Sequence, residues 1–441
     1  MANTIGTNGT PFRKHPTLPI AIVGGGLGGL ALAIGLVKHG INVKIFEAAP
    51  AFSEIGAGVA FGINSIRALQ LIDPRLLEGY KKHATFNADP SRADSFYTLL
   101  WGMEEREGGM HKAGDHAFRV DDVWQFERTQ EMGVKTRSCI HRARLLEELI
   151  ALLPQGITTF GKRFDTAREL PDGSLELQFT DGTTALASAI VGCDGIKSHV
   201  RGLVCPRVQP KYVGEVAYRA VVPKVHVEAA LGTDLASNGH MYAGYGTYII
   251  TYPIENGELI NVVGVKHDAR PQEEWEWAHS EWTVPATKEE FAHAFEGWYA
   301  PLVQLFGKHM LPTKWALHVV QHDEPYYKDR VCLLGDAAHA TVPHLGAGAG
   351  MAMEDAYILS SLIASANDAK DIERAFCAYD AVRRPRTQQC IRRSLRGSPR
   401  LTDDGLDGFK KSIEESFRWL WLEDLEKQLD MAKSVMSDRW P

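Results

Sequence analysis

The chain has 441 residues, with 48 Lys and Arg against 55 Asp and Glu, a formal charge of −7 and 44% hydrophobic residues. These proportions are typical of a globular protein of two or three domains and exclude an intrinsically disordered chain. Without a basic excess, the chain is not expected to bind nucleic acid through bulk charge. Its six cysteines are scattered, with no Cys-x-x-Cys pair, so neither a metal site nor a disulfide framework is expected.

The N-terminal segment gives no sign of secretion or membrane insertion. Residues 1–17 are polar and are interrupted by glycine and proline, which predicts a flexible tail. The run from Leu18 to Val37 is apolar, but its five glycines would weaken a membrane-spanning helix, and no basic segment with a cleavage site accompanies it. We therefore expect a cytoplasmic protein that does not contact membranes.

A strand, a glycine turn and a helix follow. Leu18–Val23 is a short apolar run, Gly24–Gly29 fits the pattern G-x-G-x-x-G, and a helix and a second strand lead to Glu47. In such a unit the glycines let the backbone approach a pyrophosphate, the helix N-terminus attracts the phosphates, and the acid binds ribose hydroxyls. The acid also argues against bound NADP, whose 2′-phosphate it would repel. The unit predicts a dinucleotide site formed by Gly24, Gly26, Gly29 and Glu47.

Three later segments could approach the same ligand. The loop Phe52–Gly58 contains glycines that allow close approach, although a plain surface turn would look the same. Arg142 begins an apolar helix and could reach a phosphate, although a solvated basic residue is the simpler interpretation of that segment alone. Asp194 and Gly195 end a buried strand, where open α/β sheets bind cofactors.

Residues 212–266 alternate between short β-rich runs and turns, which predicts an antiparallel sheet inserted into the α/β fold. Arg219 lies in the middle of one run between apolar neighbours, and a charge in that position needs a partner. The partner could be a ligand anion, and a structural ion pair or an exposed strand edge is as probable. Several tyrosines, Tyr242 and Tyr252 among them, follow nearby and could line a pocket or serve only in packing.

The last third begins with another buried strand that ends in a Gly-Asp turn at Asp336. Pro343 and the glycine turn Gly346–Gly350 precede a new helix, whose bare backbone N–H groups could face an electron-rich ring edge. The remaining chain reads as helical, with an interruption expected at Arg383–Arg386 and a closing amphipathic helix over residues 419–435.

Together the three motifs resemble the single-component, group A FAD-dependent aromatic monooxygenases with the para-hydroxybenzoate hydroxylase fold, over roughly residues 18–390. The sequence departs from many members at Ala347, where they carry Gln. The Gly-Ala-Gly-Ala-Gly turn is similar to the salicylate hydroxylase subgroup and to fungal enzymes that dearomatise phenolic polyketide aldehydes.

The resemblance implies an α/β fold with a Rossmann-like FAD-binding domain. That domain would comprise residues 18–205 and 326–395, with an inserted antiparallel β-sheet substrate domain at 206–325 and a C-terminal helical segment at 396–441. It implies that FAD contacts Gly24, Gly26, Gly29, Glu47, Gly58, Arg142, Asp194, Gly195, Asp336, Pro343, Gly346, Ala347, Gly348, Ala349 and Gly350. The C-terminal helices and tryptophan-rich segments could support a homodimer.

The activity implied is hydroxylation of a small phenolic substrate, with FAD, NADH in preference to NADPH, and O2 as co-substrate. A flavin C4a-hydroperoxide would attack the ring, and salicylate 1-monooxygenase, which releases CO2 and catechol, is the favoured member. The alternatives are hydroxylation or dearomatisation of another phenol, such as a polyketide-type phenol or 3-hydroxybenzoate, and a non-catalytic flavin-binding redox protein. Candidate catalytic residues are Arg219 for a carboxylate or phenolate, His344 for proton relay, and Tyr242 and Tyr252 as pocket residues.

Overall fold

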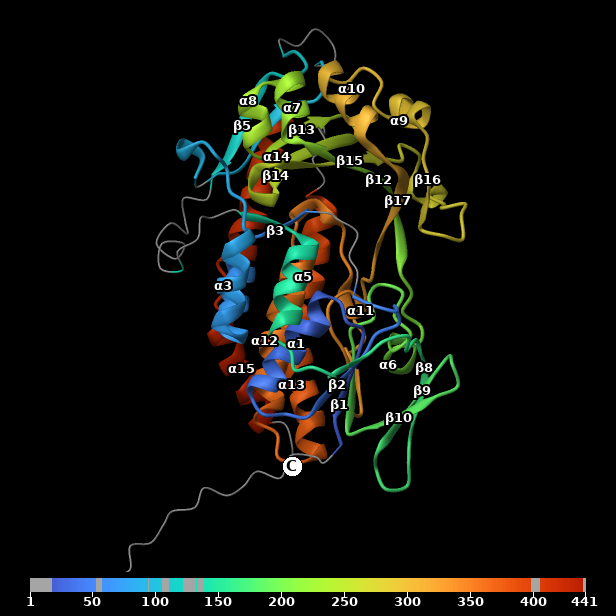
Figure 1. Ribbon diagram of the computed structural model, residues 1–441. Coiled ribbons are helices and arrows are strands. Elements are labelled where there is room, and N and C mark those ends of the chain that lie inside the picture. The colour runs from blue at the N-terminus through green and yellow to red at the C-terminus, as the bar shows by residue number, and fades with distance from the viewer. Residues whose placement is uncertain are drawn as a thin grey trace, which may run out of the picture.

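The computed structural model describes residues 18–52, 58–93, 95–104, 111–121, 132, 138–397 and 405–438. The predicted tail 1–17 and most of the predicted loop between Phe52 and Gly58 lie outside these ranges. In Figure 1 the helix-rich part of the molecule, with the first strands of the chain, lies below a second sheet that carries its own helices. The chain passes between these two parts several times.

A six-stranded sheet forms the centre of the helix-rich part. Its order is β18–β19–β11–β1–β2–β7, formed by Tyr327–Lys328, Val331–Leu333, Ala189–Gly192, Ile20–Val23, Val43–Phe46 and Thr158–Thr159. β1 pairs in parallel with β2 and β11, and all four of its residues are buried. A central parallel strand is covered on both faces, which explains its continuous apolar run. The α/β class predicted from the sequence is confirmed.

Long helices pack beside this sheet (Figure 1). They are α1 (Leu27–Lys38), α2 (Ile63–Ile72), α3 (Pro74–His83), α5 (Arg142–Ala151), α12 (Gly348–Ile363), α13 (Ala369–Arg396) and α15 (Leu425–Asp438). By contrast, α14 (Gly405–Trp421) lies against the second sheet, where its Phe417 contacts Phe96. α1 and α12 approach so closely that a Cβ added at Gly35 would meet the side chain of Ser360. Smaller sheets join β8–β10 (Phe164–Glu169, Leu175–Phe179, Thr184–Ala187) and β3 with β6 (Gly58–Phe61, Ser138–His141).

The second part is an eight-stranded sheet. Its order is β16–β17–β12–β15–β14–β13–β4–β5, formed by Thr283–Pro285, Met310–Val319, Lys211–Pro223, Leu259–His267, Thr247–Ile254, His240–Gly244, Ser95–Trp101 and His116–Asp121. All pairs are antiparallel except β13 with β4. The predicted boundary at residue 206 is therefore wrong for this sheet, because β4 and β5 come from an earlier part of the chain.

The two faces of this sheet pack against different partners. One face buries an aromatic cluster that includes Tyr218, Tyr242, Phe291 and Phe306. The last two come from α9 (Lys288–Ala294) and α10 (Ala300–His309), which lie over this face with α7 (Lys224–Leu231) and α8 (Thr233–Ser237). The opposite face turns toward the helix-rich part. Since side chains alternate along a strand, neighbouring residues in sequence serve different faces.

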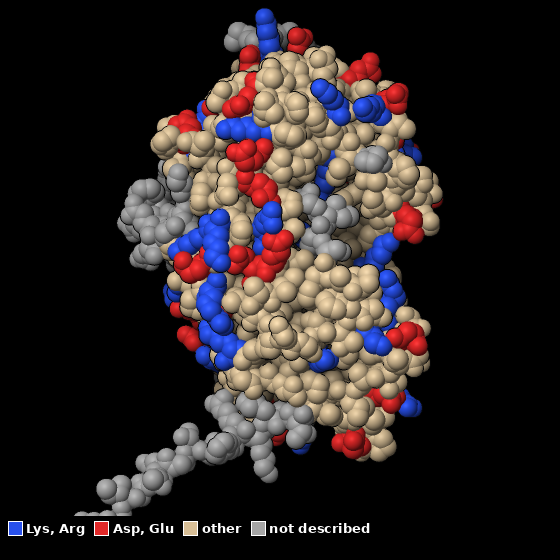
Figure 2. All heavy atoms as spheres, in the orientation of Figure 1, with Lys and Arg blue, Asp and Glu red and all other residues tan. Residues whose placement is uncertain are grey.

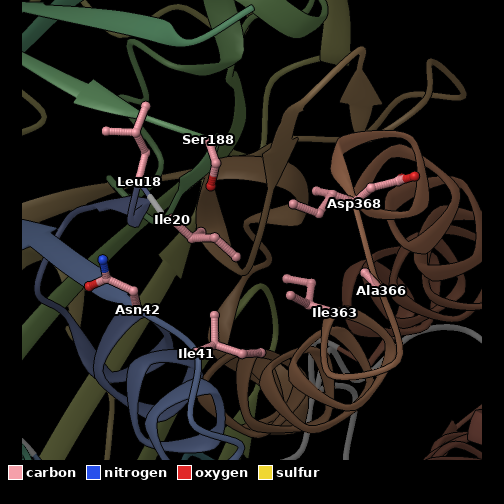
Figure 3. A pocket seen from close by; sticks show the side chains of 9 residues that line it. Leu18, Ile20, Ile41, Asn42, Ser188, Ile363, Ala366 and Asp368 are labelled. Atoms are coloured by element: carbon pink, nitrogen blue, oxygen red, sulfur yellow. The ribbon is translucent and has the colours of Figure 1, made fainter. Parts of the chain in front are cut away.

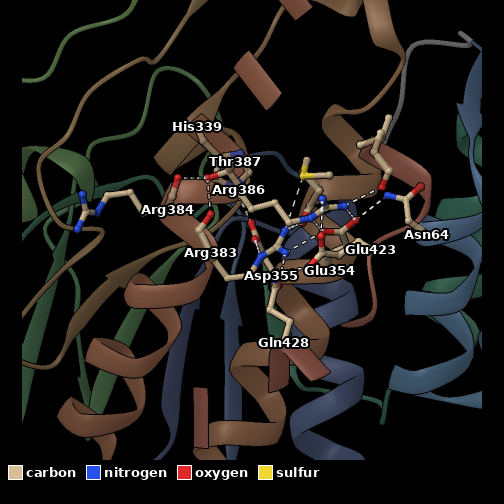
Figure 4. Close-up of polar contacts among 12 residues, drawn as sticks. Asn64, His339, Glu354, Asp355, Arg383, Arg384, Arg386, Thr387, Glu423 and Gln428 are labelled. Atoms are coloured by element: carbon tan, nitrogen blue, oxygen red, sulfur yellow. Dashed lines mark hydrogen bonds and ion pairs between the residues drawn. The ribbon is translucent and has the colours of Figure 1, made fainter. Parts of the chain in front are cut away.

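The C-terminal helices correct two sequence-based expectations. α13 runs through Arg383–Arg386 without interruption and contains Pro385. The side chains of Arg383 and Arg386 point into the protein and bind acidic groups of α12, as Figure 4 shows. The residues predicted to interrupt the helix therefore belong to it, and two of their side chains take part in an internal ionic network. The closing helix predicted at 419–435 is instead two helices, α14 and α15, with a break after Trp421.

On the face drawn in Figure 2, acidic and basic side chains are intermixed. Ion pairs such as Lys82–Glu148 and Arg144–Glu147 join them. No helix among the described residues is long and apolar enough to cross a membrane.

Candidate active site

A large cavity lies between the cofactor motifs and the inward face of the eight-stranded sheet. Many of the site residues predicted from the sequence line it, although they come from distant parts of the chain. They are Gly26, Gly58, Arg142, Gly195, Arg219, Tyr252, Asp336, Pro343, His344, Gly346, Ala347, Gly348 and Ala349. The remaining predicted residues, Gly24, Gly29, Glu47, Asp194, Tyr242 and Gly350, do not line it.

The first glycine turn shapes one end of the cavity. Gly24 has φ +105°, a conformation that favours glycine, and a Cβ there would collide with the backbone carbonyl of Cys193. Around Gly26, by contrast, nothing lies within 4 Å of where a Cβ would stand. Gly26 also lines the cavity and caps the N-terminus of α1. The turn therefore leaves open space in front of unpaired helix N–H groups, where a pyrophosphate fits.

The carboxylates of Glu47 and Asp194 accept hydrogen bonds from nearby backbone N–H groups. Glu47 accepts hydrogen bonds from the N–H groups of Gly25 at 2.6 Å and Ala49 at 2.8 Å. Asp194 accepts from the Ser198 hydroxyl at 2.5 Å and from the N–H of His199 at 2.8 Å. Both acids thus fix the turns beside the cavity. Direct contact of either one with a cofactor stays a prediction.

The second glycine turn and the Gly-Asp turn form the cavity's other wall. Asp336 is exposed toward the cavity, and the N–H of Gly335 donates to Asp355. Gly346 adopts the left-handed conformation just before α12, whose N-terminal residues line the cavity. Gly350 lies one turn deeper, where a Cβ would collide with the side chain of Ser65. The glycine at this position allows the close contact between α12 and Ser65. A contact of Gly350 with the cofactor stays a prediction.

The ionic network of Figure 4 anchors these turns. Arg383 donates from Nε to Asp355 at 2.7 Å and from Nη1 to Glu354 at 2.7 Å. Asp355 also binds His339 at 2.5 Å. Burial alone would raise the pKa of Asp355, but His339 and Arg383 outweigh it and lower this pKa to about 2. A permanently charged, fully buried network therefore holds the Gly-Asp turn in place.

Arg219 supplies the cavity with a cation. Its guanidinium lies 3.8 Å from the ring centre of Trp315 on β17, and among the described residues nothing accepts a hydrogen bond from its Nε. Burial lowers the pKa of Arg219 to about 10, a shift that Tyr252 opposes. A guanidinium of this pKa is charged at neutral pH. The sequence left open a structural ion pair for Arg219, but no carboxylate of the described chain pairs with it.

His344 lies between Tyr248 and Glu215 in a buried polar chain. Its Nδ1 forms a 2.9 Å hydrogen bond with the Tyr248 hydroxyl, and its Nε2 donates to Glu215 Oε2 at 2.8 Å. The other oxygen of Glu215 lies 3.7 Å from Nδ1 of His267. Glu215 and His267 were not predicted as site residues. The signal was available, because Glu215 and Arg219 are four residues apart in one strand and so share a face.

The two predicted tyrosines differ in position. Tyr252 lines the cavity, and its hydroxyl donates to the carbonyl of Gly58 at 2.8 Å. Tyr242 is fully buried on the opposite face of the sheet and stacks against Tyr299. Its neighbour Met241 lines the cavity instead. The prediction of Tyr242 as a catalytic residue is therefore wrong, because strand alternation points it away from the site.

The sheet side of the cavity is otherwise apolar. Its lining includes Tyr248, one of the tyrosines expected near the pocket, and the residues Phe96, Tyr97, Met241, Ile250 and Val263, which the sequence did not indicate. Apolar walls with a few convergent polar groups are typical of small-molecule sites. A second, much smaller pocket lies near the start of β1 (Figure 3), mostly between apolar residues such as Ile20 and Ile363. Its Asp368 caps α13, so we assign this pocket to packing.

Comparisons with known proteins agree with this geometry. Residues 159–394 match the model of an FAD binding domain, and residues 22–53 match that of an NAD(P)-binding Rossmann-like domain. The chain is 37% identical to 6-methylsalicylate 1-monooxygenase of Aspergillus terreus, over 95% of this chain and 92% of that protein. It is also 37% identical to a salicylate hydroxylase of Pseudomonas putida, over 95% of each chain. A solved salicylate hydroxylase substrate complex superposes with a TM-score of 0.77 at 30% identity, covering 94% of this chain and 98% of that one.

Proposed function

Because this chain belongs to the FAD-dependent aromatic monooxygenases, we propose that it hydroxylates a salicylate at the carbon that bears the carboxyl group, releasing CO2 and leaving a catechol. The comparisons confirm two expectations from the three motifs, the monooxygenase family and the FAD cofactor. Two relatives, named for salicylate and for 6-methylsalicylate, are equally similar to this chain and support a salicylate ring as the substrate.

FAD, when bound, supplies the activation of O2 and the transfer of one oxygen atom to an electron-rich ring. Its pyrophosphate would lie at Gly26 and the N-terminus of α1, and its ribityl chain at Asp336. Its ring would lie along Pro343 and the turn that follows. These residues line one cavity, and the open space at Gly26 fits the close approach of a phosphate. We propose them as the cofactor contacts, with NADH as the reductant.

The observation that carries the proposal is the Arg219 guanidinium, which lines the cavity and whose Nε has no hydrogen-bond acceptor among the described residues. A buried cation is unfavourable without an anion, and a carboxylate binds guanidinium through two parallel hydrogen bonds. A salicylate carboxylate on Arg219 would place the ring among Met241, Ile250 and Val263. The apolar walls would also exclude water from the reacting carbon.

The ring must also be made more electron-rich before oxygen transfer. Loss of the phenolic proton achieves this, and a base has to be within reach of the hydroxyl or linked to it through another group. We assign that function to His344, which lines the cavity and forms a hydrogen bond with the Tyr248 hydroxyl. Tyr252 would hold the substrate against the loop that begins β3, because its hydroxyl already binds Gly58.

A second candidate is hydroxylation or dearomatisation of another phenol, such as 3-hydroxybenzoate or a polyketide-type phenol, without loss of a carboxyl group. Arg219 favours it as well, since a guanidinium can bind a phenolate oxygen. The two candidates differ in their products, because only the first releases CO2.

The test is NADH consumption and CO2 release by the FAD-loaded protein in air, with salicylate, 6-methylsalicylate and 3-hydroxybenzoate. We expect NADH, CO2 and catechol in equal amounts with at least one of the two salicylates. NADH consumption without CO2, accompanied by a hydroxylated product that retains the carboxyl group, would support the second candidate. No stimulation by any phenol would overturn both.

A further inference from the structure

The C-terminal helix α14 supports one wall of the cavity from behind. Its Phe417 and Trp421 are buried and stack on each other, with their ring centres 4.5 Å apart. Both rings contact Phe96 of β4, at 4.4 Å and 5.0 Å between ring centres. Phe96 lines the cavity, whereas none of the described residues of α14 does. The helix therefore touches the cavity only through the residues that line it.

A β-bulge turns Phe96 toward the cavity. From Ser95 to Tyr97, β4 advances two residues, while its partner β5 advances one residue, from Asp121 to Val120. Phe96 is the extra residue, and such a bulge changes the direction of a side chain and is common beside active sites. Neighbouring residues of a regular strand serve opposite faces, yet both Phe96 and Tyr97 line the cavity. The bulge thus adds a second aromatic ring to this wall.

The end of α14 is fixed in place by two further contacts. Arg386, which belongs to the ionic network, donates from Nη2 to the carbonyl of Leu420 at 2.9 Å. Trp421 lies so close to the start of α2 that a Cβ added at Gly62 would collide with Nε1 of its indole. The two rings of α14 are therefore a fixed support. Because protein interiors are close-packed, Phe96 has little room to move away from the cavity.

The strand register shows which part of a bound ring would face this wall. Arg219, Val263, Ile250 and Met241 are direct neighbours across four successive strands, and all of them line the cavity. Neighbouring strands lie about 4.8 Å apart, a distance similar to the size of one aromatic ring. A salicylate whose carboxylate binds Arg219 would therefore cover Val263 and Ile250. Its ring carbon opposite the carboxyl group would point along this row, toward β4 and Phe96.

We propose that α14 limits the size of the substituent that the substrate can carry at this ring carbon, because Phe417 and Trp421 hold Phe96 against it. The proposal rests on the proposed function, since it presumes a salicylate bound to Arg219. Phe96 would touch the substituent, whereas Phe417 and Trp421 would act through Phe96 as positioning residues. The substrate class is a salicylate that carries hydrogen or a small alkyl group para to its carboxyl group.

The same helix offers a matched control. Phe409 is buried like Phe417 and also contacts an aromatic ring of the second sheet, that of Phe118 on β5, at 6.1 Å between ring centres. Phe118 is not among the residues that line the cavity. A substitution at Phe409 should therefore disturb the packing of α14 without reaching the substrate.

The test measures the affinity of the FAD-loaded protein, without NADH, for salicylate and for its 4-methyl, 4-ethyl and 4-propyl derivatives. Flavin absorbance titration gives each Kd. In wild type we expect affinity to fall about tenfold from the 4-methyl to the 4-propyl compound, because overpacking against a fixed ring is unfavourable. Phe417→Leu leaves space behind Phe96, and each methylene group that finds room strengthens binding about fourfold. This variant should bind the 4-propyl compound about tenfold more tightly than wild type does, with the Kd of salicylate unchanged.

Further variants show whether the effect passes through Phe96. Phe96→Leu should enlarge the pocket directly, and combining it with Phe417→Leu should bring no further gain, since both changes act on the same space. Phe409→Leu should leave the affinity for all four ligands at the wild-type values. FAD binding and thermal unfolding report whether each variant is folded. Phe417→Met, which removes less volume, replaces Phe417→Leu if that variant does not fold, and the same direction of change is expected.

The outcomes separate the size limit from the proposed function. If wild type discriminates by size and the Phe417 variant keeps the same profile, α14 does not set the limit, and the proposed function stands. Equal shifts in the Phe417 and Phe409 variants would show a general loosening of the helix and would contradict the proposal. Equal affinity of wild type for salicylate and the 4-propyl compound would show that Phe96 is not the end of the pocket. If wild type binds none of the four ligands, the proposed function fails, and the size limit fails with it.

Discussion

Two buried polar clusters lie on either side of the cofactor turns, and they differ in how their charges are paired. The Arg383 network joins Arg383 and Arg386 to Glu354 and Asp355, and all four residues are buried. The cavity cluster comprises Arg219, Tyr248, His344 and Glu215. In it, Arg219 has no carboxylate partner among the described residues, and the other three are joined by hydrogen bonds that a proton can cross.

This difference in charge pairing distinguishes a cluster that stabilises the fold from a cluster that we propose acts on a ligand. Burial opposes the charge of Arg383, but Glu354 and Asp355 outweigh it and raise the pKa of Arg383. Every charge in that network is balanced from within the chain, so it needs nothing else. No carboxylate among the described residues pairs with Arg219, so we propose that its partner is a ligand anion. Removing a charge should therefore have opposite effects on stability in the two clusters.

The largest effect is expected from Arg383→Met. The change removes a cation that two buried carboxylates share, leaving Glu354 with Arg386 and Asp355 with His339, and loss of one partner of a buried ion pair destabilises a protein by about 3–5 kcal/mol. Urea unfolding measures it. Arg384→Met is the matched control, since the Arg384 side chain is 28% exposed and its partner Asp380 keeps a hydrogen bond from the Tyr326 N–H, and should lose about 1 kcal/mol or less. Equal losses in both variants would show that the network is not specially stabilising.

Arg219→Gln should behave in the opposite way. It removes a half-buried cation that lines the cavity and has no carboxylate partner among the described residues, so the ligand-free protein should unfold at the same or higher urea concentration. The kcat/KM for salicylate should fall about 30- to 1,000-fold, since a buried charge pair truncated on one side loses about 2–4 kcal/mol. Steady-state NADH oxidation measures the expected fall in kcat/KM, and urea unfolding measures the expected equal or higher stability. Marked destabilisation would mean that Arg219 is a structural residue.

The pH dependence of stability should also identify the Arg383 network. The folded pKa of Asp355, about 2, is lower than its unfolded value, so its stabilisation is complete above the unfolded pKa and is lost as pH falls through the folded one. We expect stability to decline between about pH 4 and pH 2, by about 2 kcal/mol from this group. Thermal unfolding in that window should show a shallower decline in Asp355→Asn. An identical slope would contradict the depressed pKa.

The smallest effect is expected at the glycine turn. Gly26→Ala adds a methyl group into open space, so the fold should tolerate it, whereas FAD affinity should fall about tenfold because the methyl occupies the phosphate approach. Flavin fluorescence titration measures the affinity. Gly24→Ala is the contrasting variant, and it should destabilise the protein itself, because φ there is +105° and the Cβ would strike Cys193. Unchanged FAD affinity in Gly26→Ala would place the pyrophosphate elsewhere.

The sequence predicted the cofactor half of the fold well, because local patterns encode it. A buried strand, a glycine turn and a helix follow each other directly, and Gly26, Asp336 and Ala347 all reach the cavity. The sheet half was harder, since β4 and β5 join the eight-stranded sheet from a segment far from β13 in sequence. No local pattern reports such a crossover.

The errors at single residues have the same origin. Tyr242 looked equivalent to Tyr252 in sequence, but the two lie on opposite faces once the strands are aligned. The sequence predicted an interruption of the helix at Arg383–Arg386, because the partners of these arginines on α12 are about thirty residues away. Glu215 was overlooked although it shares a strand face with Arg219. Its partner His344 is 129 residues distant, and only the folded chain brings the two together.

The most direct test of the central claim is whether Arg219 is the receptor for a substrate carboxylate. Flavin absorbance titrations without NADH would give the Kd of salicylate and of salicyl alcohol for wild type and Arg219→Gln. We predict that wild type prefers salicylate by about 30-fold or more, and that Arg219→Gln abolishes this preference while binding salicyl alcohol as before. An equal preference in both proteins would show that the carboxylate binds elsewhere, and would contradict the account of the cavity given above.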